Sequence, residues 1–299
     1  MDKPFLLLLF LLSSCSLPIS ISSYNVPAIF TFGDSIVDAG NNHFNKNCSV
    51  QADFPPYGST FFHHPTGRFT NGRTVADFIS QFLGIELQSP YLEARLAVMN
   101  GSRRNYPSNG INFASAGSGV LRQTNQDSAM LREVENLMGH IYRLGGRRIA
   151  VFSLGPVGCV PARVFVPNAP VEKCFGRMNV MVKKYNEGLE SLVKDIPVRY
   201  PGAVGVYGAV YDAVQRYRAT PARYGFTNVM GACCGDGPLR GLLKCGKEGY
   251  KICPNPETYL FWDYFHPSEH TYKLISKVLW GGKNSTIRPF NLQTLASML

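Results

Sequence analysis

The chain has 299 residues, of which 45% are hydrophobic and 17% charged, and its formal net charge is +10. This composition excludes a disordered protein and allows one large hydrophobic core. The basic residues are scattered, without a basic helix or base-stacking aromatic motif, so we expect no nucleic-acid partner. A surface of this kind fits two situations: adhesion to an anionic matrix such as cell-wall polysaccharide, or simple solvation of the charges.

The first 22 residues predict a signal peptide. Asp2 and Lys3 precede a hydrophobic run at 5–12 that is too short to span a bilayer. Small residues follow, and Ser20-Ile21-Ser22 fits a cleavage site. No later segment is long and apolar enough to be a transmembrane helix. We therefore expect a secreted, extracellular protein without a transmembrane segment.

Predicted strands and helices alternate along the remaining chain. Short hydrophobic runs predict strands at 28–32, 111–114, 148–154 and 203–207. Hydrophobic residues at helical spacing predict helices at 75–83, 131–144, 178–192, 212–217 and 272–279. This alternation is typical of an α/β protein whose mostly parallel sheet is covered on both faces. Without repeats or a linker, we expect one domain, at 27–285.

The cysteines favour disulfides over a metal site. Eight are present, one of them, Cys15, in the predicted signal peptide. Cys159 and Cys174 flank a short loop and are plausible partners. Four others lie close together in the sequence, and zinc binding is the alternative to disulfides for them: Cys233, Cys234, Cys245 and Cys253. Adjacent cysteines do not fit the usual zinc-ligand spacing, and secretion favours disulfides, which leaves Cys48 without a partner.

Three Asn-x-Ser/Thr sequences predict glycosylation. They begin at Asn47, Asn100 and Asn284. Glycosylation at these positions requires that each asparagine lie on the surface.

A serine, a histidine and an aspartate carry the strongest chemical pattern. Ser35 follows the first predicted strand, at the kind of strand end where α/β proteins collect their chemistry. Asp263 precedes His266 by three residues, so the carboxylate can accept a hydrogen bond from the ring. A serine becomes nucleophilic when a base removes its proton and a third group orients that base.

A metal-dependent phosphoesterase is a weaker interpretation of the same region. It would use four potential ligands: Asp34, Asp38, Asp263 and His266. The order of the motifs explains these residues better, so we expect no metal and no cofactor.

Five sequence blocks follow one another along the chain: Phe32-Gly33-Asp34-Ser35 with its continuation to Asn42, and the segments 67–73, 111–119, 153–159 and 259–267. In their sequences and their order, these blocks resemble the plant GDSL esterase/lipase family of the SGNH hydrolase superfamily. The resemblance implies a three-layer α/β/α sandwich of flavodoxin-like topology that hydrolyses carboxylic esters, including lipid esters. It also implies that Ser35 is the nucleophile, His266 the general base and Asp263 its partner. The backbone amides of Ser35 and Gly117 would form the oxyanion hole, with Gly119 as the alternative to Gly117.

One block of the resembled family is missing. Family members carry a Gly-x-Asn-Asp block after a strand, and its asparagine donates a further oxyanion hydrogen bond; this chain has no such sequence. In flavodoxin-like order the lost strand lies between the first and fourth strands. We therefore expect the segments 28–32 and 148–154 either to pair directly or to leave a gap in the sheet. Asn41 and Asn42 are candidate replacement donors.

Two functions follow from these patterns. The first is a secreted serine esterase or lipase, impaired by loss of the asparagine block. The alternative is a catalytically inactive secreted protein with a hydrolase scaffold that binds cell-wall polysaccharide or lipid.

Overall fold

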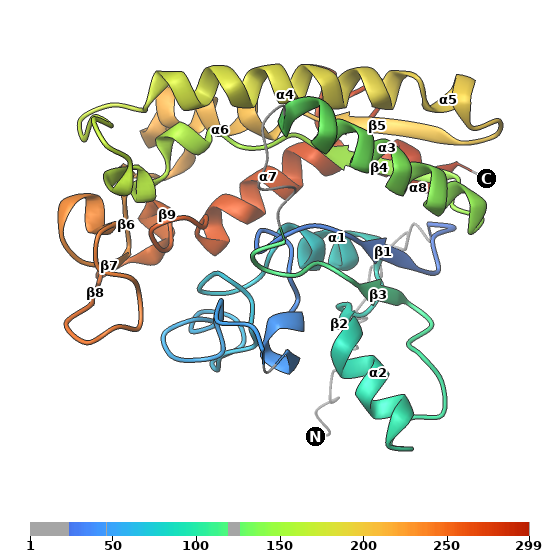
Figure 1. Cartoon of the computed structure of the whole chain (residues 1–299), viewed down its shortest axis with the longest axis horizontal. Helices are drawn as coiled ribbons and strands as arrows, with labels where there is room; N and C mark the ends of the chain where they lie inside the picture. Colours follow the sequence, from blue (N-terminus) through green and yellow to red (C-terminus); the bar gives the residue numbers. More distant parts are fainter. Residues whose placement is uncertain (1–23, 46, 119–125, 299) are drawn as a thin grey trace, which may run out of the picture.

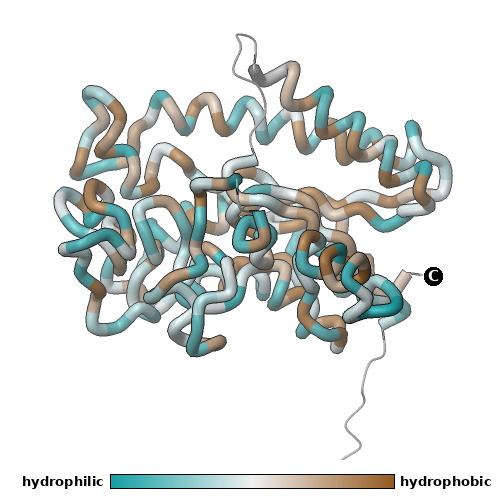
Figure 2. Tube along the Cα trace, turned by 60° about the horizontal axis from the view of Figure 1, so that its bottom comes forward, coloured by the Kyte–Doolittle hydropathy of each residue, from teal (hydrophilic) through white to brown (hydrophobic). Residues whose placement is uncertain are grey.

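The computed structural model describes residues 24–45, 47–118 and 126–298. The predicted signal peptide and Gly119 lie outside these ranges. The described chain forms an α/β structure whose strands are mostly parallel. No helix of the described chain is long and apolar enough to cross a membrane. In Figure 2, hydrophobic and hydrophilic stretches are short and alternate along the described chain.

Strands from the N-terminal part of the chain form a three-stranded parallel sheet. Strand β1 (Ile29–Thr31) pairs in parallel with β3 (Gly110–Asn112), which pairs in parallel with β2 (Ser89–Pro90). Helix α1 (Val75–Leu83) packs against the later helix α7 (Glu269–Gly281), and α2 (Tyr91–Met99) follows β2 directly.

The C-terminal half of the sheet is covered on both faces. Strand β4 (Arg148–Phe152) pairs in parallel with β5 (Val204–Gly208), and β10 (Ile287–Arg288) adds antiparallel to β5. Helices α3 (Gln126–Arg143), α4 (Gly176–Lys194) and α5 (Ile196–Arg199) contribute to the core on one face. Helices α6 (Val210–Ala219), α7 and α8 (Leu292–Ser297) share the other core with α1. Figure 1 shows α4 and α7 on opposite sides of β4 and β5. This arrangement is the predicted three-layer sandwich.

Successive residues of β5 show why two cores form. Val206 points into the core shared with α7, whereas Tyr207 joins the core beneath α4. Side chains of a strand alternate between its two faces, so one strand contributes to both layers.

Two short strand pairs and three disulfides build the remaining part of the described chain. Strand β6 (Asn228–Ala232) pairs in parallel with β9 (Tyr259–Phe261), and β7 (Cys234–Gly235) pairs antiparallel with β8 (Lys251–Ile252). The disulfides are Cys159–Cys174, Cys233–Cys253 and Cys234–Cys245. The predicted disulfide pair at Cys159 and Cys174 and the preference for disulfides over zinc are both confirmed. Cys48 is free.

Short 3-10 helices complete the described structure. They are η1 (Asn41–Phe44), η2 (Val157–Cys159), η3 (Pro161–Phe165), η4 (Pro221–Tyr224), η5 (Pro238–Arg240) and η6 (Pro256–Thr258).

The sheet has a gap between β1 and β4, the second of the two expected outcomes. Over the described residues, the strand orders are β2-β3-β1 and β10-β5-β4, with no pairing between the two sets. Phe30, in β1, is 61% exposed, and Phe32 just after it is 40% exposed. A strand edge with unpaired backbone groups and exposed aromatic rings is a template for association with another strand.

Capping residues explain why the α1 bounds agree with the sequence prediction. Thr74 and Asp77 form a capping box, in which the Asp77 side chain accepts from the Thr74 backbone amide at 2.8 Å. Gly84 ends the helix with a left-handed φ of 73°. The sequence prediction does not include α2, β6 and β10.

Replacing Phe30 by lysine tests the exposed edge. Phe30→Lys should reduce concentration-dependent self-association, because a charge on an edge strand opposes strand pairing. The free energy of unfolding should change by less than about 0.5 kcal/mol, since Phe30 is mostly exposed. Sedimentation velocity over a concentration series measures the association. Val198→Lys, at an 84% exposed position on α5, is the control, and an equal effect of both variants would contradict the role of the edge.

Candidate active site

Two strand ends position the predicted catalytic side chains. Ser35 lies in the turn after β1, where the Asp34 carboxylate accepts a hydrogen bond from the Ile36 backbone amide at 3.0 Å. Asp263 and His266 lie between β9 and α7. All three predicted residues are buried, with Asp263 fully so. Segments more than two hundred residues apart in sequence therefore meet at one site.

The structure brings Ser35, His266 and Asp263 into one hydrogen-bonded series. The Nε2 atom of His266 is 2.8 Å from the Ser35 Oγ atom. On the other side of the ring, Nδ1 lies 2.9 Å from both carboxylate oxygens of Asp263. With the proton on Nδ1, Nε2 is free to accept the serine proton, which is the arrangement a general base requires.

Hydrogen bonds keep the Asp263 carboxylate charged despite its burial. Burial acts to raise the pKa of Asp263, but the interaction with His266 and hydrogen bonds from the Phe265 amide and Tyr57 outweigh it, so the pKa is lowered. The Oδ1 atom accepts from the Phe265 and His266 backbone amides at 2.8 and 2.7 Å. The carboxylate is thereby fixed in orientation as well as in charge.

Tyr57 extends the series by one residue that the sequence analysis missed. Its hydroxyl donates to the Oδ2 atom of Asp263 at 2.7 Å, and its ring is buried. Burial and the neighbouring carboxylate raise the pKa of Tyr57, which keeps its proton in place for donation. Tyr57 follows Pro55-Pro56 at no recognisable spacing from the other site residues, so the sequence carried no signal for this contact.

The segment 67–73 holds the start of α7 beside the site. Asn71 accepts a hydrogen bond from the Glu269 amide at 2.9 Å, and Arg73 forms an ion pair with the Glu269 carboxylate at 2.6 Å. The ring of Phe69 lies 5.0 Å from the His266 ring. This block thus restricts the position of the histidine through α7 and through direct packing.

The segment with Cys233 and Cys234 fixes the backbone just before Asp263 by hydrogen bonds. Backbone amides of Cys233 and Cys234 donate to the carbonyls of Phe261 and Trp262 at 3.0 and 2.7 Å. Trp262 is fully buried in a cluster with the cysteines of both neighbouring disulfides. The residue directly before Asp263 is therefore fixed by covalently cross-linked surroundings.

The turn that carries Gly117 is tied to the turn after Ser35. Asp38 accepts hydrogen bonds from the backbone amides of Gly40, Asn41 and Ala116 at 2.7, 2.7 and 2.9 Å. Burial raises the pKa of Asp38 against the effect of these donors. Gly117 has a left-handed φ of 79°, a conformation that favours glycine. Asp38 is therefore occupied in joining two loops.

The expectation that Asn41 or Asn42 replaces the missing donor is wrong. The Asn41 amide nitrogen donates to the carbonyls of Asn112 and Ala114 at 2.8 Å each. The Asn42 amide nitrogen donates to the carbonyls of Val50 and Ala116 at 2.8 Å each. Buried backbone carbonyls require partners, so both asparagines serve to join loops.

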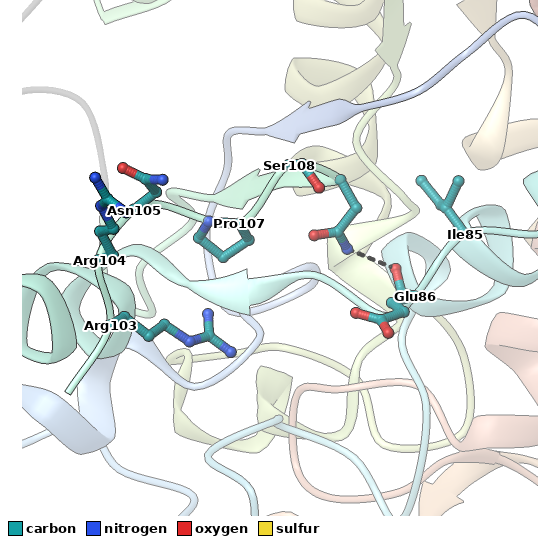
Figure 3. Close-up of a pocket in the computed structure, with 8 residues that line it drawn as sticks. Ile85, Glu86, Arg103, Arg104, Asn105, Pro107 and Ser108 are labelled. Atoms are coloured by element: carbon teal, nitrogen blue, oxygen red, sulfur yellow. Dashed lines mark hydrogen bonds between the residues drawn. The ribbon is translucent and has the colours of Figure 1, made fainter.

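A surface pocket lies apart from the triad. It is lined by Arg103 and Arg104 and by further residues of the segments 85–86 and 105–109 (Figure 3). None of the three predicted catalytic residues lines this pocket. Among the described residues, no cluster of three or more histidine, cysteine, aspartate or glutamate side chains is arranged to hold a metal ion.

The fold and the site define an α/β protein with a serine–histidine–aspartate series. Comparison with known proteins identifies its family: the GDSL-like Lipase/Acylhydrolase family matches residues 29–137 and 121–279. The chain belongs to this family.

Three relatives show how far the similarity extends. The chain is 53% identical to GDSL esterase/lipase 6 of Arabidopsis thaliana, over 98% of this chain and 96% of the relative. It is 29% identical to GDSL esterase/lipase 5 of the same plant, over 96% and 92%. It is 27% identical to a GDSL lipase of Tanacetum cinerariifolium, over 92% and 89%.

The comparisons also locate an interruption of the family pattern. The alignment with GDSL esterase/lipase 6 covers 351 positions, more than the 299 residues of this chain, so some positions fall opposite gaps in this chain. The two matched segments of the family overlap at 121–137, between β3 and β4. The interruption therefore coincides in sequence with the division of the sheet.

Removal of the Tyr57 hydroxyl tests its contact with Asp263. Tyr57→Phe removes the hydroxyl donor from Oδ2 of the buried Asp263 carboxylate and leaves that oxygen with the His266 contact, which should lower the free energy of unfolding by about 1–3 kcal/mol. Chemical denaturation at neutral pH measures this change. Tyr106→Phe, at an exposed tyrosine, is the matched control. Equal stability of Tyr57→Phe and wild type would contradict the contact.

His270, near the start of α7, should make the stability of the folded protein depend on pH. In His270, Nδ1 lies 3.3 Å from the Glu257 carboxylate and Nε2 lies 2.8 Å from the Tyr224 carbonyl. The hydrogen bond with Glu257 raises the pKa of His270, and the pKa of Glu257 is lowered for the same reason; nearby Lys273 acts against the His270 shift.

The stabilisation by His270 should therefore be present below the ordinary histidine pKa of about 6.5 and should decline as the pH rises through the raised pKa. Melting temperatures of wild type and His270→Gln, measured at a series of pH values from below about 6.5 into the alkaline range, quantify the effect. The difference between the two proteins should be largest at the acidic end. A difference that grows towards alkaline pH would contradict the assignment.

Proposed function

We propose that the chain is a secreted carboxylic ester hydrolase that acts through an acyl-serine intermediate. The observation that carries this proposal is the position of His266 between Ser35 and Asp263, with 2.8 Å from Nε2 to Oγ and 2.9 Å from Nδ1 to the carboxylate. The names of its relatives, which include esterases and lipases, agree with this chemistry.

In the proposed reaction, the Ser35 Oγ atom attacks the acyl carbon of the ester while His266 takes its proton at Nε2. Asp263 stabilises the resulting imidazolium through Nδ1. His266 then gives the proton to the departing alcohol oxygen, which leaves the acyl group on Ser35. A water molecule, deprotonated by His266, releases the acid and restores the serine.

Two backbone amides are the proposed oxyanion donors. Those of Ser35 and Gly117 lie in adjoining turns, since the Ser115 amide donates to the Gly33 carbonyl at 3.0 Å. The sequence lacks the asparagine block that supplies a third donor in the resembled family, and the amides of Asn41 and Asn42 are engaged elsewhere in the described structure. Loss of one oxyanion donor typically lowers turnover by about 10²–10³, so we propose an impaired enzyme.

Other residues, outside the site, support the proposal that the protein is secreted and glycosylated. The hydrophobic N-terminal segment, the disulfides and the exposure of Asn47, Asn100 and Asn284 all fit a secreted glycoprotein. The charge of +10 fits retention on anionic cell-wall polysaccharide.

Covalent labelling tests the proposed nucleophile. A fluorescent alkyl phosphonate should label the purified protein at Ser35, identified by peptide mass spectrometry. Ser35→Ala should lose the label, whereas Ser118→Ala, a serine of the neighbouring exposed turn, should keep it. An unlabelled, folded wild type would overturn the proposal and favour the inactive binding protein.

A further inference from the structure

The disulfide between Cys159 and Cys174 differs from the other two described disulfides in its surroundings. Cys159 is fully buried, whereas Cys174 is half-buried in an exposed stretch with Glu172 and Lys173. In the other two disulfides all four cysteines are buried in the apolar cluster around Trp262. An external thiol can therefore reach Cys174 more readily than any other disulfide-bonded cysteine that the structure describes.

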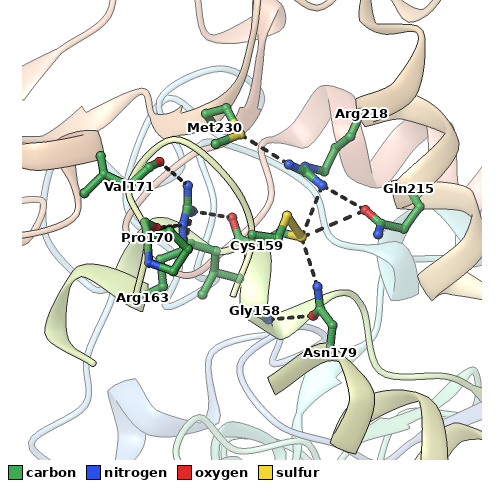
Figure 4. Close-up of a disulfide and its surroundings, with 11 residues drawn as sticks. Gly158, Cys159, Arg163, Pro170, Val171, Asn179, Gln215, Arg218 and Met230 are labelled. Carbon is green, nitrogen blue, oxygen red and sulfur yellow. Dashed lines mark hydrogen bonds between the residues drawn. A yellow bond between two sulfur atoms is a disulfide. The ribbon is translucent and has the colours of Figure 1, made fainter. Parts of the chain in front are cut away.

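A cation and an amide surround the sulfur of Cys159. The Nη1 atom of Arg218, in α6, lies 3.2 Å from the Cys159 sulfur, and the side-chain nitrogen of Asn179, in α4, lies 3.4 Å from it (Figure 4). Arg218 otherwise contacts the neutral Gln215 and Met230 side chains. Within the described residues no carboxylate forms an ion pair with Arg218, so its charge has no anionic partner there.

These contacts favour a thiolate over a disulfide at Cys159. A disulfide sulfur is a weak acceptor, but a thiolate beside arginine and an N–H donor is strongly stabilised, and such surroundings lower the pKa of a cysteine. A sulfur that is more stable as thiolate is also the better leaving group in thiol–disulfide exchange. At the other disulfides, Arg240 reaches the carbonyl oxygen of Cys233 at 2.9 Å.

We propose that Cys174 is a thiol-exchange site for small-molecule thiols, with Cys159 as the leaving group. The attacking thiolate forms a bond to the Cys174 sulfur, the Cys159–Cys174 bond breaks, and its electron pair remains on Cys159 as the thiolate beside Arg218. A monothiol stops at the mixed disulfide on Cys174. With a dithiol, the second thiolate attacks the bound reagent sulfur and releases Cys174, so the reagent is oxidised and both cysteines are reduced.

The loop between the two cysteines is built to retain its shape after exchange. The buried Arg163 guanidinium donates to the carbonyls of Cys159 and Val160 near one end of the loop, at 2.7 and 3.0 Å. It also donates to the carbonyls of Pro170 and Val171 near the other end, at 3.1 and 3.0 Å. Both ends thus remain joined when the covalent bond is broken. The loop also reaches the site, because the Ala162 amide donates to the carbonyl of Tyr264, the residue after Asp263, at 2.7 Å.

Limited reduction tests the exchange site without use of esterase activity. The experiment uses full-length mature protein carrying Cys48→Ser, which prevents exchange with the free thiol. Samples are treated with dithiothreitol or glutathione for increasing times, quenched with an alkylating reagent and digested for mass spectrometry. We expect dithiothreitol to free Cys159 and Cys174 first, and glutathione to add to Cys174, while the other two disulfides persist.

Charge variants test the part played by Arg218. Arg218→Gln should slow reduction of Cys159–Cys174 by about tenfold, because the sulfur that leaves as a thiolate loses its neighbouring positive charge. Arg218→Lys should stay closer to wild type, and Arg223→Gln, an exposed arginine outside the contact, should not differ from it.

Melting temperatures of all variants ensure that only folded proteins are compared. Simultaneous reduction of all three disulfides, glutathione addition at a buried cysteine, or an unchanged rate in Arg218→Gln would each overturn the proposal. The same is true if Arg218→Lys reacts as slowly as Arg218→Gln.

Discussion

The hydrogen bonds of His266 are the constraint on which the rest of the site depends. They join a serine that follows the first strand of the described chain to an aspartate that precedes the helix α7. Ser35 follows a strand of the β2-β3-β1 sheet, whereas Asp263 follows β9, which among the described strands pairs with β6. The geometry of the site therefore does not rest on continuous strand pairing between the two segments. It depends on the packing of α1 against α7 and on the hydrogen bonds that fix the Asp263 carboxylate.

In a continuous parallel sheet, strand pairing both positions the catalytic side chains and buries the strand that carries the nucleophile. The gap between β1 and β4 means that the two must be considered separately here. One is the position of the catalytic side chains, which the helical layer, the 67–73 segment and the disulfide-linked cluster maintain. The other is the burial of β1, which the described structure does not achieve, as the exposure of Phe30 shows. A site of this kind can be well ordered while the strand that carries its nucleophile remains open at one edge.

Much of the fold was predictable because local signals agree with the tertiary structure. Thr74 and Gly84 mark both ends of α1, and the Asp-x-x-His spacing places a carboxylate beside the His266 ring. Contacts without a local signal were not predictable. Tyr57 reaches Asp263 across 206 residues, and nothing in its sequence neighbourhood indicates a partner. Asn41 and Asn42 failed as donors because nearby backbone carbonyls, invisible in the sequence, already occupy their amides.

If His266 is held as a base between Ser35 and Asp263, its two ring nitrogens must differ in protonation, and nitrogen NMR of the imidazole observes both of them. In protein labelled with nitrogen-15 histidine, we expect that neutral His266 carries its proton on Nδ1, with slow solvent exchange, and that this signal is lost in Asp263→Ala. A neutral His266 protonated on Nε2, or an Nδ1 proton unaffected by the Asp263 substitution, would contradict this role of His266.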